Sequence, residues 1–166
     1  MTFLKHMAAL AAGLSMIALA GAASAEEFKL SPEIAQHAKD GKKLVFAISY
    51  HDPSVAFAGP IRDGVAKAAA DLGVEASFVG PVGGGAEKQI AELETIIEKG
   101  VDGLAISSAS TDALAPLINK TLAKGIPVIA FNTDNPKSDR LTFIGQDLVL
   151  SGKTVGEQLV KYMGEK

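Results

Sequence analysis

The sequence predicts an α/β protein with a three-layer, doubly wound parallel sheet. Between residues 44 and 163, short apolar runs alternate with longer segments in which apolar residues recur at helical spacing. Three of the helical segments are followed by glycine, at Gly73, Gly100 and Gly125, as helices commonly are. Strands that alternate with helices form βαβ units, and right-handed crossovers then place helices on both faces of a parallel sheet.

The expected elements follow one another along the chain. In the polar segment 26–43, Ser31 and Pro32 indicate the start of a short helix that runs to about Asp40. The first strand, 44–50, is a continuous apolar run, which is typical of a strand buried on both faces. Further strands are expected at 74–80, 102–107, 126–132 and 142–146. Helices are expected at 58–72, at 86–99, through Lys124 after a cap at Thr111 or Asp112, and at 148–163.

Residues 1–25 have the layout of a secretory signal peptide. Lys5 and His6 precede an uncharged segment, 7–23, that is rich in Ala, Leu and Ile. Ala23-Ser24-Ala25 is a small-x-small cleavage signal, so cleavage is expected after Ala25. A membrane anchor would need about 20 strongly apolar residues, and this segment is shorter and interrupted by glycine and serine. We therefore expect export to the periplasm without stable insertion in the membrane.

The composition argues against several classes of function. The chain has no cysteine, which excludes disulfides, Cys-bound metals, thiol catalysis and a lipidated N-terminal Cys. The net charge is −3 and the basic residues are scattered, whereas nucleic-acid binding needs concentrated positive charge. The glycine-rich loop 81–85 lacks the Lys-Ser/Thr ending of a phosphate-binding loop. No catalytic or metal-binding motif is present, so neither an enzyme nor a cofactor is predicted.

Ligands of such sheets bind at the carboxyl ends of the strands, which selects residues 50–57, 80–86, 107–111 and 132–135. In the first of these segments, Phe57 could offer a flat apolar face to a sugar ring, and His51 could bond a hydroxyl. The competing interpretations are that Phe57 packs on the following helix as a hydrophobic staple, which its position alone favours, and that His51 is simply solvated.

Asn132 and Asp134 follow the fourth strand. An amide both donates and accepts hydrogen bonds and a carboxylate accepts them, so the pair suits vicinal hydroxyls. Turn formation before Pro136 is an equally weighted alternative, because Asn and Asp close loops through their own backbone. The serines at 107, 108 and 110 are expected to form hydrogen bonds or cap a helix.

Residues 44–166 resemble the ribose-binding-like periplasmic sugar-binding proteins of ABC transporters. The segments that carry the resemblance are EKQIAELETIIEKGVDGLAIS (87–107), DALAPLINKTLAKGIPVIAFN (112–132) and FIGQDLVLSGKTVGEQL (143–159). The resemblance implies two α/β lobes that close over a small sugar or polyol and deliver it to an inner-membrane ABC permease. It assigns the stacking aromatic to Phe57 and the hydroxyl-binding residue to Asn132, with looser matches at Asp134 and His51.

The same resemblance implies a domain organisation. Residues 44–146 correspond to the first lobe, and residues 147–166 to the start of a second, truncated lobe whose helix lacks a partner for its apolar face. Family members are about twice as long, so a fragment with weakened ligand affinity is expected. A binding protein that serves a chemoreceptor or sensor kinase remains an alternative. A sugar-responsive repressor would need an N-terminal helix-turn-helix, which the export signal replaces, and an enzyme has no supporting motif.

Overall fold

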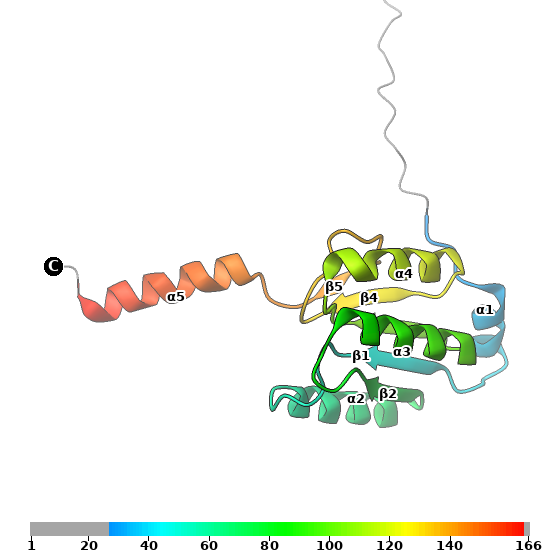
Figure 1. Ribbon diagram of the computed structural model, residues 1–166. Coiled ribbons are helices and arrows are strands. Elements are labelled where there is room, and N and C mark those ends of the chain that lie inside the picture. Colours follow the sequence, from blue (N-terminus) through cyan, green and yellow to red (C-terminus); the bar gives the residue numbers. More distant parts are fainter. Residues whose placement is uncertain (1–26, 165–166) are drawn as a thin grey trace, which may run out of the picture.

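The computed structural model describes residues 27–164, so the predicted signal peptide lies outside the described residues. The elements occur in the order expected from the sequence (Figure 1). They are α1 (Pro32–Lys39), β1 (Val45–Ser49), α2 (Ala58–Leu72), β2 (Glu75–Val79), α3 (Ala86–Lys99), β3 (Gly103–Ile106), α4 (Thr111–Ala123), β4 (Val128–Phe131), β5 (Phe143–Ile144) and α5 (Leu148–Met163).

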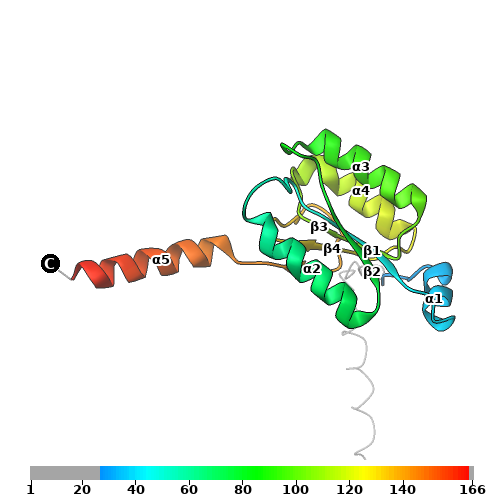
Figure 2. The same cartoon turned by 90° about the horizontal axis from the view of Figure 1, so that it is seen from below.

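The five strands form one parallel sheet in the order β2-β1-β3-β4-β5. Helices α3 and α4 lie side by side on one face, and α2 lies on the opposite face against β2 (Figures 1 and 2). This arrangement confirms the predicted three-layer, doubly wound fold.

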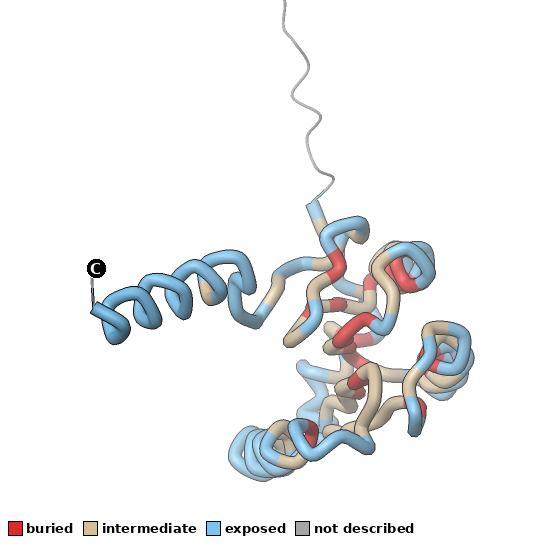
Figure 3. Tube along the Cα trace, turned by 60° about the vertical axis from the view of Figure 1, so that its left-hand side comes forward, coloured by how far each residue is buried: buried red, intermediate tan, exposed pale blue. Residues whose placement is uncertain are grey.

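The core lies between the sheet and the α3–α4 layer. Alternate residues of β3 and β4 point into it, and Leu104, Ile106 and Val128 are at most 4% exposed. The intervening residues Ala105 and Ile129 are only half-buried, because they point to the opposite face of the sheet. Buried residues accordingly gather in the sheet and on the sheet-facing sides of α3 and α4 (Figure 3). The core cluster comprises Ala47, Leu93, Ile97, Leu104, Ile106, Leu114, Ile118 and Val128.

Local sequence signals explain most element ends. Ser31 caps α1 by accepting a hydrogen bond from the Glu33 amide at 3.2 Å. The predicted cap of α4 at Thr111 or Asp112 is wrong by one or two positions: Ser110 is extended, and its hydroxyl accepts from the Ala113 amide at 3.3 Å. The fifth strand is shorter than predicted, because only Ala130 and Phe131 of β4 pair with it.

Helix α5 projects away from the rest of the described chain and contains no buried residue (Figures 1 and 3). Asp147 caps it, accepting from the Leu150 amide at 2.9 Å. The apolar side chains expected to lack a partner are exposed, Leu148 by 75%, Val155 by 59% and Leu159 by 57%. No helix in the described part of the chain is both long and apolar enough to span a membrane.

Candidate ligand-binding site

The parallel register brings three polar side chains together at the carboxyl edge of the sheet. Ser49 of β1 is paired with Ile106 of β3, and Ile106 with Ala130 of β4. His51, Ser107 and Asn132 each follow one of these strands by one or two residues, so they emerge at the same edge.

Ser107 is the centre of this cluster. Its Oγ lies 2.9 Å from Nδ1 of His51 and accepts a hydrogen bond from Nδ2 of Asn132 at 3.2 Å. A hydroxyl that accepts from an amide still has its own proton to donate. Donation to Nδ1 of a neutral His51 would place the ring proton on Nε2, where it could be given to a ligand oxygen. We call His51, Ser107 and Asn132 the strand-end cluster.

Asn132 adopts a left-handed backbone conformation with φ of 55°. Asparagine tolerates this region better than most residues. Its Nδ2 lies within 3.5 Å of the Tyr50 hydroxyl and 3.3 Å of Thr133 Oγ1 in addition to Ser107. The amide nitrogen is therefore held on the protein side. Among residues 27–164 no donor bonds Oδ1 of Asn132, which leaves that oxygen able to accept from a ligand hydroxyl.

Tyr50 is a buried residue that contacts both His51 and Asn132 of the cluster. It is 2% exposed, and its ring lies 4.3 Å from the ring of His51 and 5.9 Å from that of Phe78, centroid to centroid. Burial raises the pKa of the Tyr50 hydroxyl above its usual value, an effect that the hydrogen bond with Asn132 partly offsets. The hydroxyl is therefore protonated at neutral pH and serves as a fixed polar contact for Asn132.

Phe57 is 65% exposed, so the hydrophobic-staple interpretation is wrong. A staple uses the residue before the N-cap, whereas Phe57 itself occupies the N-cap position of α2. Its ring is thus available at the carboxyl side of the sheet, as a stacking residue would need to be.

Asp52, which sequence analysis did not single out, joins two loops of this edge. Its Oδ1 accepts hydrogen bonds from the Ser54 hydroxyl at 2.6 Å, the Ser54 amide at 3.0 Å and the Gly83 amide at 3.3 Å. The Ser54 hydroxyl is the main cause of a pKa of Asp52 below the usual range. The loop 81–85 therefore serves as a turn that packs on the loop after β1.

Asp134 is not part of the strand-end cluster. Its carboxylate forms a two-pronged ion pair with Arg140, in which Nη2 donates to Oδ2 at 2.7 Å and Nε donates to Oδ1. Oδ1 also accepts from the Asn135 amide at 2.7 Å. The Arg140 hydrogen bonds lower the pKa of Asp134. Both carboxylate oxygens are occupied in closing the loop between β4 and β5, which is the turn role that the sequence left open.

The Asp134–Arg140 pair predicts that the free energy of unfolding depends on pH in the acidic range. Because the folded protein lowers the pKa of Asp134, its contribution to stability is complete above the unfolded-state value, about 3.9, and disappears as the pH falls through the lower folded-state value. Asp134→Asn should therefore lose less unfolding free energy than the parent between neutral and acidic pH, measured by urea unfolding. Equal losses in both proteins would contradict a stabilising Asp134–Arg140 pair.

Two buried amides were also missed. Gln89 and Asn135 are both 0% exposed, and they hydrogen-bond to the segment that connects β3 with α4. For Gln89 a signal was present, because it lies four residues before Leu93 and eight before Ile97 on the core-facing side of α3. A polar residue on such a face requires buried hydrogen bonds. Asn135 offered no such pattern.

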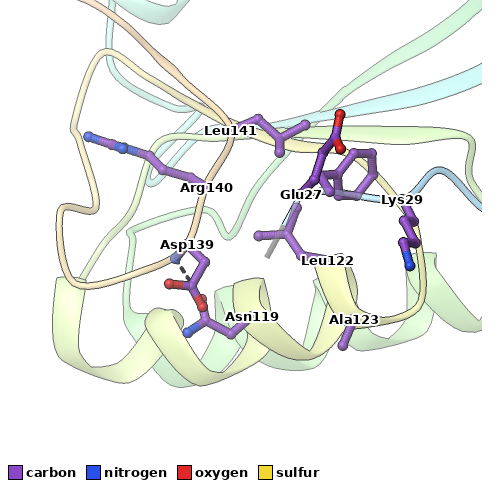
Figure 4. A pocket seen from close by; sticks show the side chains of 9 residues that line it. Glu27, Lys29, Asn119, Leu122, Ala123, Asp139, Arg140 and Leu141 are labelled. Carbon is purple, nitrogen blue, oxygen red and sulfur yellow. Dashed lines mark hydrogen bonds between the residues drawn. The ribbon is translucent and has the colours of Figure 1, made fainter. Parts of the chain in front are cut away.

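A hollow separate from the strand-end cluster is shown in Figure 4. It is bounded by the segment before α1, the second half of α4 and the loop before β5, and the Asp139 amide donates to Asn119 Oδ1 within it at 2.8 Å. None of the four sequence-predicted site residues lines it. In residues 27–164 no group of three or more potential metal-ligating side chains occurs.

Comparison with curated proteins shows which known proteins this chain is similar to in sequence. The ribose import binding protein of Salmonella typhimurium is 28% identical over 160 residues, which cover 96% of this chain and 49% of the relative. A D-ribose/D-allose-binding protein of Pseudomonas aeruginosa is 37% identical over 81 residues, 44% of this chain and 25% of the relative. The chain thus spans about half the length of the relatives that it matches over most of its own length.

The fold of this chain is also similar to that of solved structures. An ABC transporter solute-binding protein from Burkholderia graminis, crystallised in complex with D-arabinose, is 28% identical with a TM-score of 0.68, covering 72% of this chain and 41% of that one. The XylFII–LytSN complex contains a chain that is 26% identical with a TM-score of 0.68, covering 74% and 45%. The family model for the periplasmic binding protein domain matches residues 46–166. The chain therefore belongs to the periplasmic binding protein domain family.

Proposed function

We propose that this chain supplies the first-lobe half of a sugar- or polyol-binding site in the substrate-binding component of an ABC importer. The observation that carries the proposal is the strand-end cluster, together with an exposed Phe57 in the loop that follows the same strand as His51. An aromatic face and a few polar atoms with unused hydrogen-bonding capacity are what a sugar needs, since its ring has apolar C–H faces and a rim of hydroxyls. Relatives named for ribose and allose, and a structure with arabinose, support a small neutral sugar.

The proposal assigns a role to each predicted residue. Phe57 stacks on the sugar ring, Asn132 accepts from a hydroxyl through Oδ1, and His51 donates through Nε2. Asp134 is adjacent but engaged with Arg140, so it contributes through the shape of the loop.

The location and organisation of the protein are part of the same proposal. Residues 1–25 act as a signal peptide that is cleaved after Ala25, and the mature chain works in the periplasm with an inner-membrane permease. Residues 44–146 form the first lobe, α5 begins the second lobe, and a second lobe completes the site. Delivery of the ligand signal to a sensing partner is the second candidate, which the structural neighbour in complex with LytSN favours.

The test is an NMR titration of the purified chain with D-ribose, D-arabinose, D-xylose and myo-inositol, each raised to tens of millimolar. We expect at least one sugar to shift the side-chain resonances of His51 and Asn132, with weak affinity because half a site leaves its polar contacts wet. Phe57→Ala and Asn132→Ala should each weaken binding about fivefold, since each removes interactions worth about 1 kcal/mol.

Each site variant has a matched control of the same chemical type elsewhere in the described chain. Leu72→Ala removes a similarly exposed apolar side chain, 74% against 65%, at the other end of α2. Asn119→Ala removes an amide from α4, away from the strand ends. Both should bind sugar as the parent does. If none of the four sugars shifts His51 or Asn132, or if the controls weaken binding as much as the site variants, the assignment of this site is wrong.

A further inference from the structure

We propose that Gln89 is the positioning residue of this site: its buried side chain fixes Ser107, through which His51 and Asn132 are held in place. Gln89 lies in the first turn of α3 and is 0% exposed, so it cannot touch a ligand itself. The inference rests on the proposed function only for its effect on ligand affinity. Its structural consequence for the strand-end cluster can be measured without any ligand.

The carboxamide of Gln89 makes three hydrogen bonds, one to the last residue of β1 and two to the segment that follows β3. Nε2 donates to Ser49 Oγ at the end of β1 and to the Ser107 carbonyl just beyond β3, both at 3.0 Å. Oε1 accepts from the Ala109 amide at 2.9 Å. Both donors and the acceptor oxygen of one amide are therefore engaged inside the protein. The bonds fix the backbone on both sides of Ser108.

Ser107 uses different atoms for its two sets of contacts. Its carbonyl faces Gln89, while its hydroxyl meets His51 and Asn132. The hydroxyl contacts measure 2.9 and 3.2 Å, and hydrogen bonds weaken steeply beyond about 3.5 Å. A shift of the backbone at 107–109 that lengthens either contact past this limit would break it. The Gln89 bonds therefore hold the position of the hydroxyl together with two backbone bonds of the same segment, from the Ser107 amide to the Ser49 carbonyl at 2.8 Å and from the Ser108 amide to the Thr133 carbonyl at 3.3 Å.

The residues around Gln89 indicate that its side chain does more than pack in the hydrophobic core. The next positions along the same face of α3 are Leu93 and Ile97, which are apolar and belong to the core cluster. An apolar side chain at 89 would continue that packing without the cost of burying an amide. The amide instead satisfies three groups at the ends of β1 and β3, next to the site and away from the middle of the core.

The variant that tests this role is Gln89→Met, which keeps the length of the side chain and removes all three hydrogen bonds. We expect the ring Nδ1 resonance of His51 and the side-chain amide resonances of Asn132 to move, because their common partner Ser107 is released. Where a sugar binds the parent chain, affinity should fall about tenfold or more. Gln89→Glu retains the acceptor for Ala109 but loses both donors, so it should show the same direction of change.

The matched control is Asn135→Leu. Asn135 is equally buried and bonds the same connection, but at Ser108 Oγ, 3.2 Å, and the Thr111 carbonyl, 3.1 Å. It should lower stability while leaving the His51 and Asn132 resonances in place. If Gln89→Met and Gln89→Glu are destabilised but both sets of resonances stay unchanged, Gln89 is only structural and the inference fails. If the resonances move but no sugar binds even the parent chain, the positioning role stands and the proposed function fails.

Discussion

Leu93→Ala should lower the free energy of unfolding by about 3 to 5 kcal/mol, the usual range for a fully buried leucine whose site cannot collapse. Leu93 is 0% exposed on α3 and belongs to the cluster that joins this helix to the sheet and to α4. Domains of this size are commonly stable by only about 5 to 15 kcal/mol. The variant should therefore be close to its unfolding threshold at 37 °C, and urea unfolding monitored by circular dichroism will show the shift.

Leu72→Ala is the control for this prediction. Leu72 ends α2 and is 74% exposed, so the same chemical change should alter stability by no more than about 0.5 kcal/mol. A loss of less than about 1 kcal/mol in Leu93→Ala would mean that the α3–sheet contact relaxes to fill the space. Similar losses in both variants would contradict the assignment of the core to the α3–α4 side.

The fold could be predicted because its signals are local. The continuous apolar run at 44–50, the helical spacing of Leu93 and Ile97 and the glycine at position 73 each act within one turn or one strand. The predicted ends of elements were wrong where they depend on a neighbouring strand or on the local backbone conformation. The fifth strand is two residues long because β4 ends beside it, and Ser110 rather than Thr111 caps α4 because of a backbone angle that the sequence does not specify.

For the candidate site, the sequence predicted which side chains gather at one edge of the sheet but not which hydrogen bonds join them. The rule that ligands bind at strand ends correctly brought His51 and Asn132 together. It could not show that Ser107 bridges them, because the bridge joins residues 56 and 25 positions apart along the chain. The Asp134–Arg140 pair depends in the same way on how one loop folds. The staple interpretation of Phe57 failed although α2 begins at Ala58 as predicted, because the exposure of the ring depends on what packs near it and not on the helix bounds.

Gly80→Ala is the second change for which we expect a large effect, about 2 to 5 kcal/mol, from the sum of an unfavourable backbone angle and a steric overlap. Gly80 follows β2 with φ of 150°, which side-chain-bearing residues rarely adopt. A Cβ at this position would lie 2.0 Å from the carbonyl oxygen of Tyr50 and 3.1 Å from Cδ of Pro53. Neither atom is the free end of a flexible side chain, so β1 and β2 would have to separate.

The consequence extends to the site, because Tyr50 is the residue that must move. Its amide bonds the Val79 carbonyl at 2.8 Å, and its ring packs beside His51. Gly80→Ala should therefore shift the His51 resonances as well as lower stability. Gly83→Ala separates the two causes, since Gly83 also has a positive φ, 76°, but a Cβ there meets nothing within 4 Å. It should cost only about 1 to 2 kcal/mol.

If Gly80→Ala is no less stable than Gly83→Ala, the close approach of Gly80 to Tyr50 does not contribute to the packing of β1 on β2. If Gly80→Ala is less stable than Gly83→Ala but the His51 resonances are unchanged, the displacement of Tyr50 does not extend to His51. The expected joint change would mean that the position of the strand-end cluster is set by backbone contacts at the ends of β1, β2 and β3. In that case, the geometry of the proposed sugar site would depend on residues such as Gly80 and Gln89, which are not themselves proposed to contact a ligand.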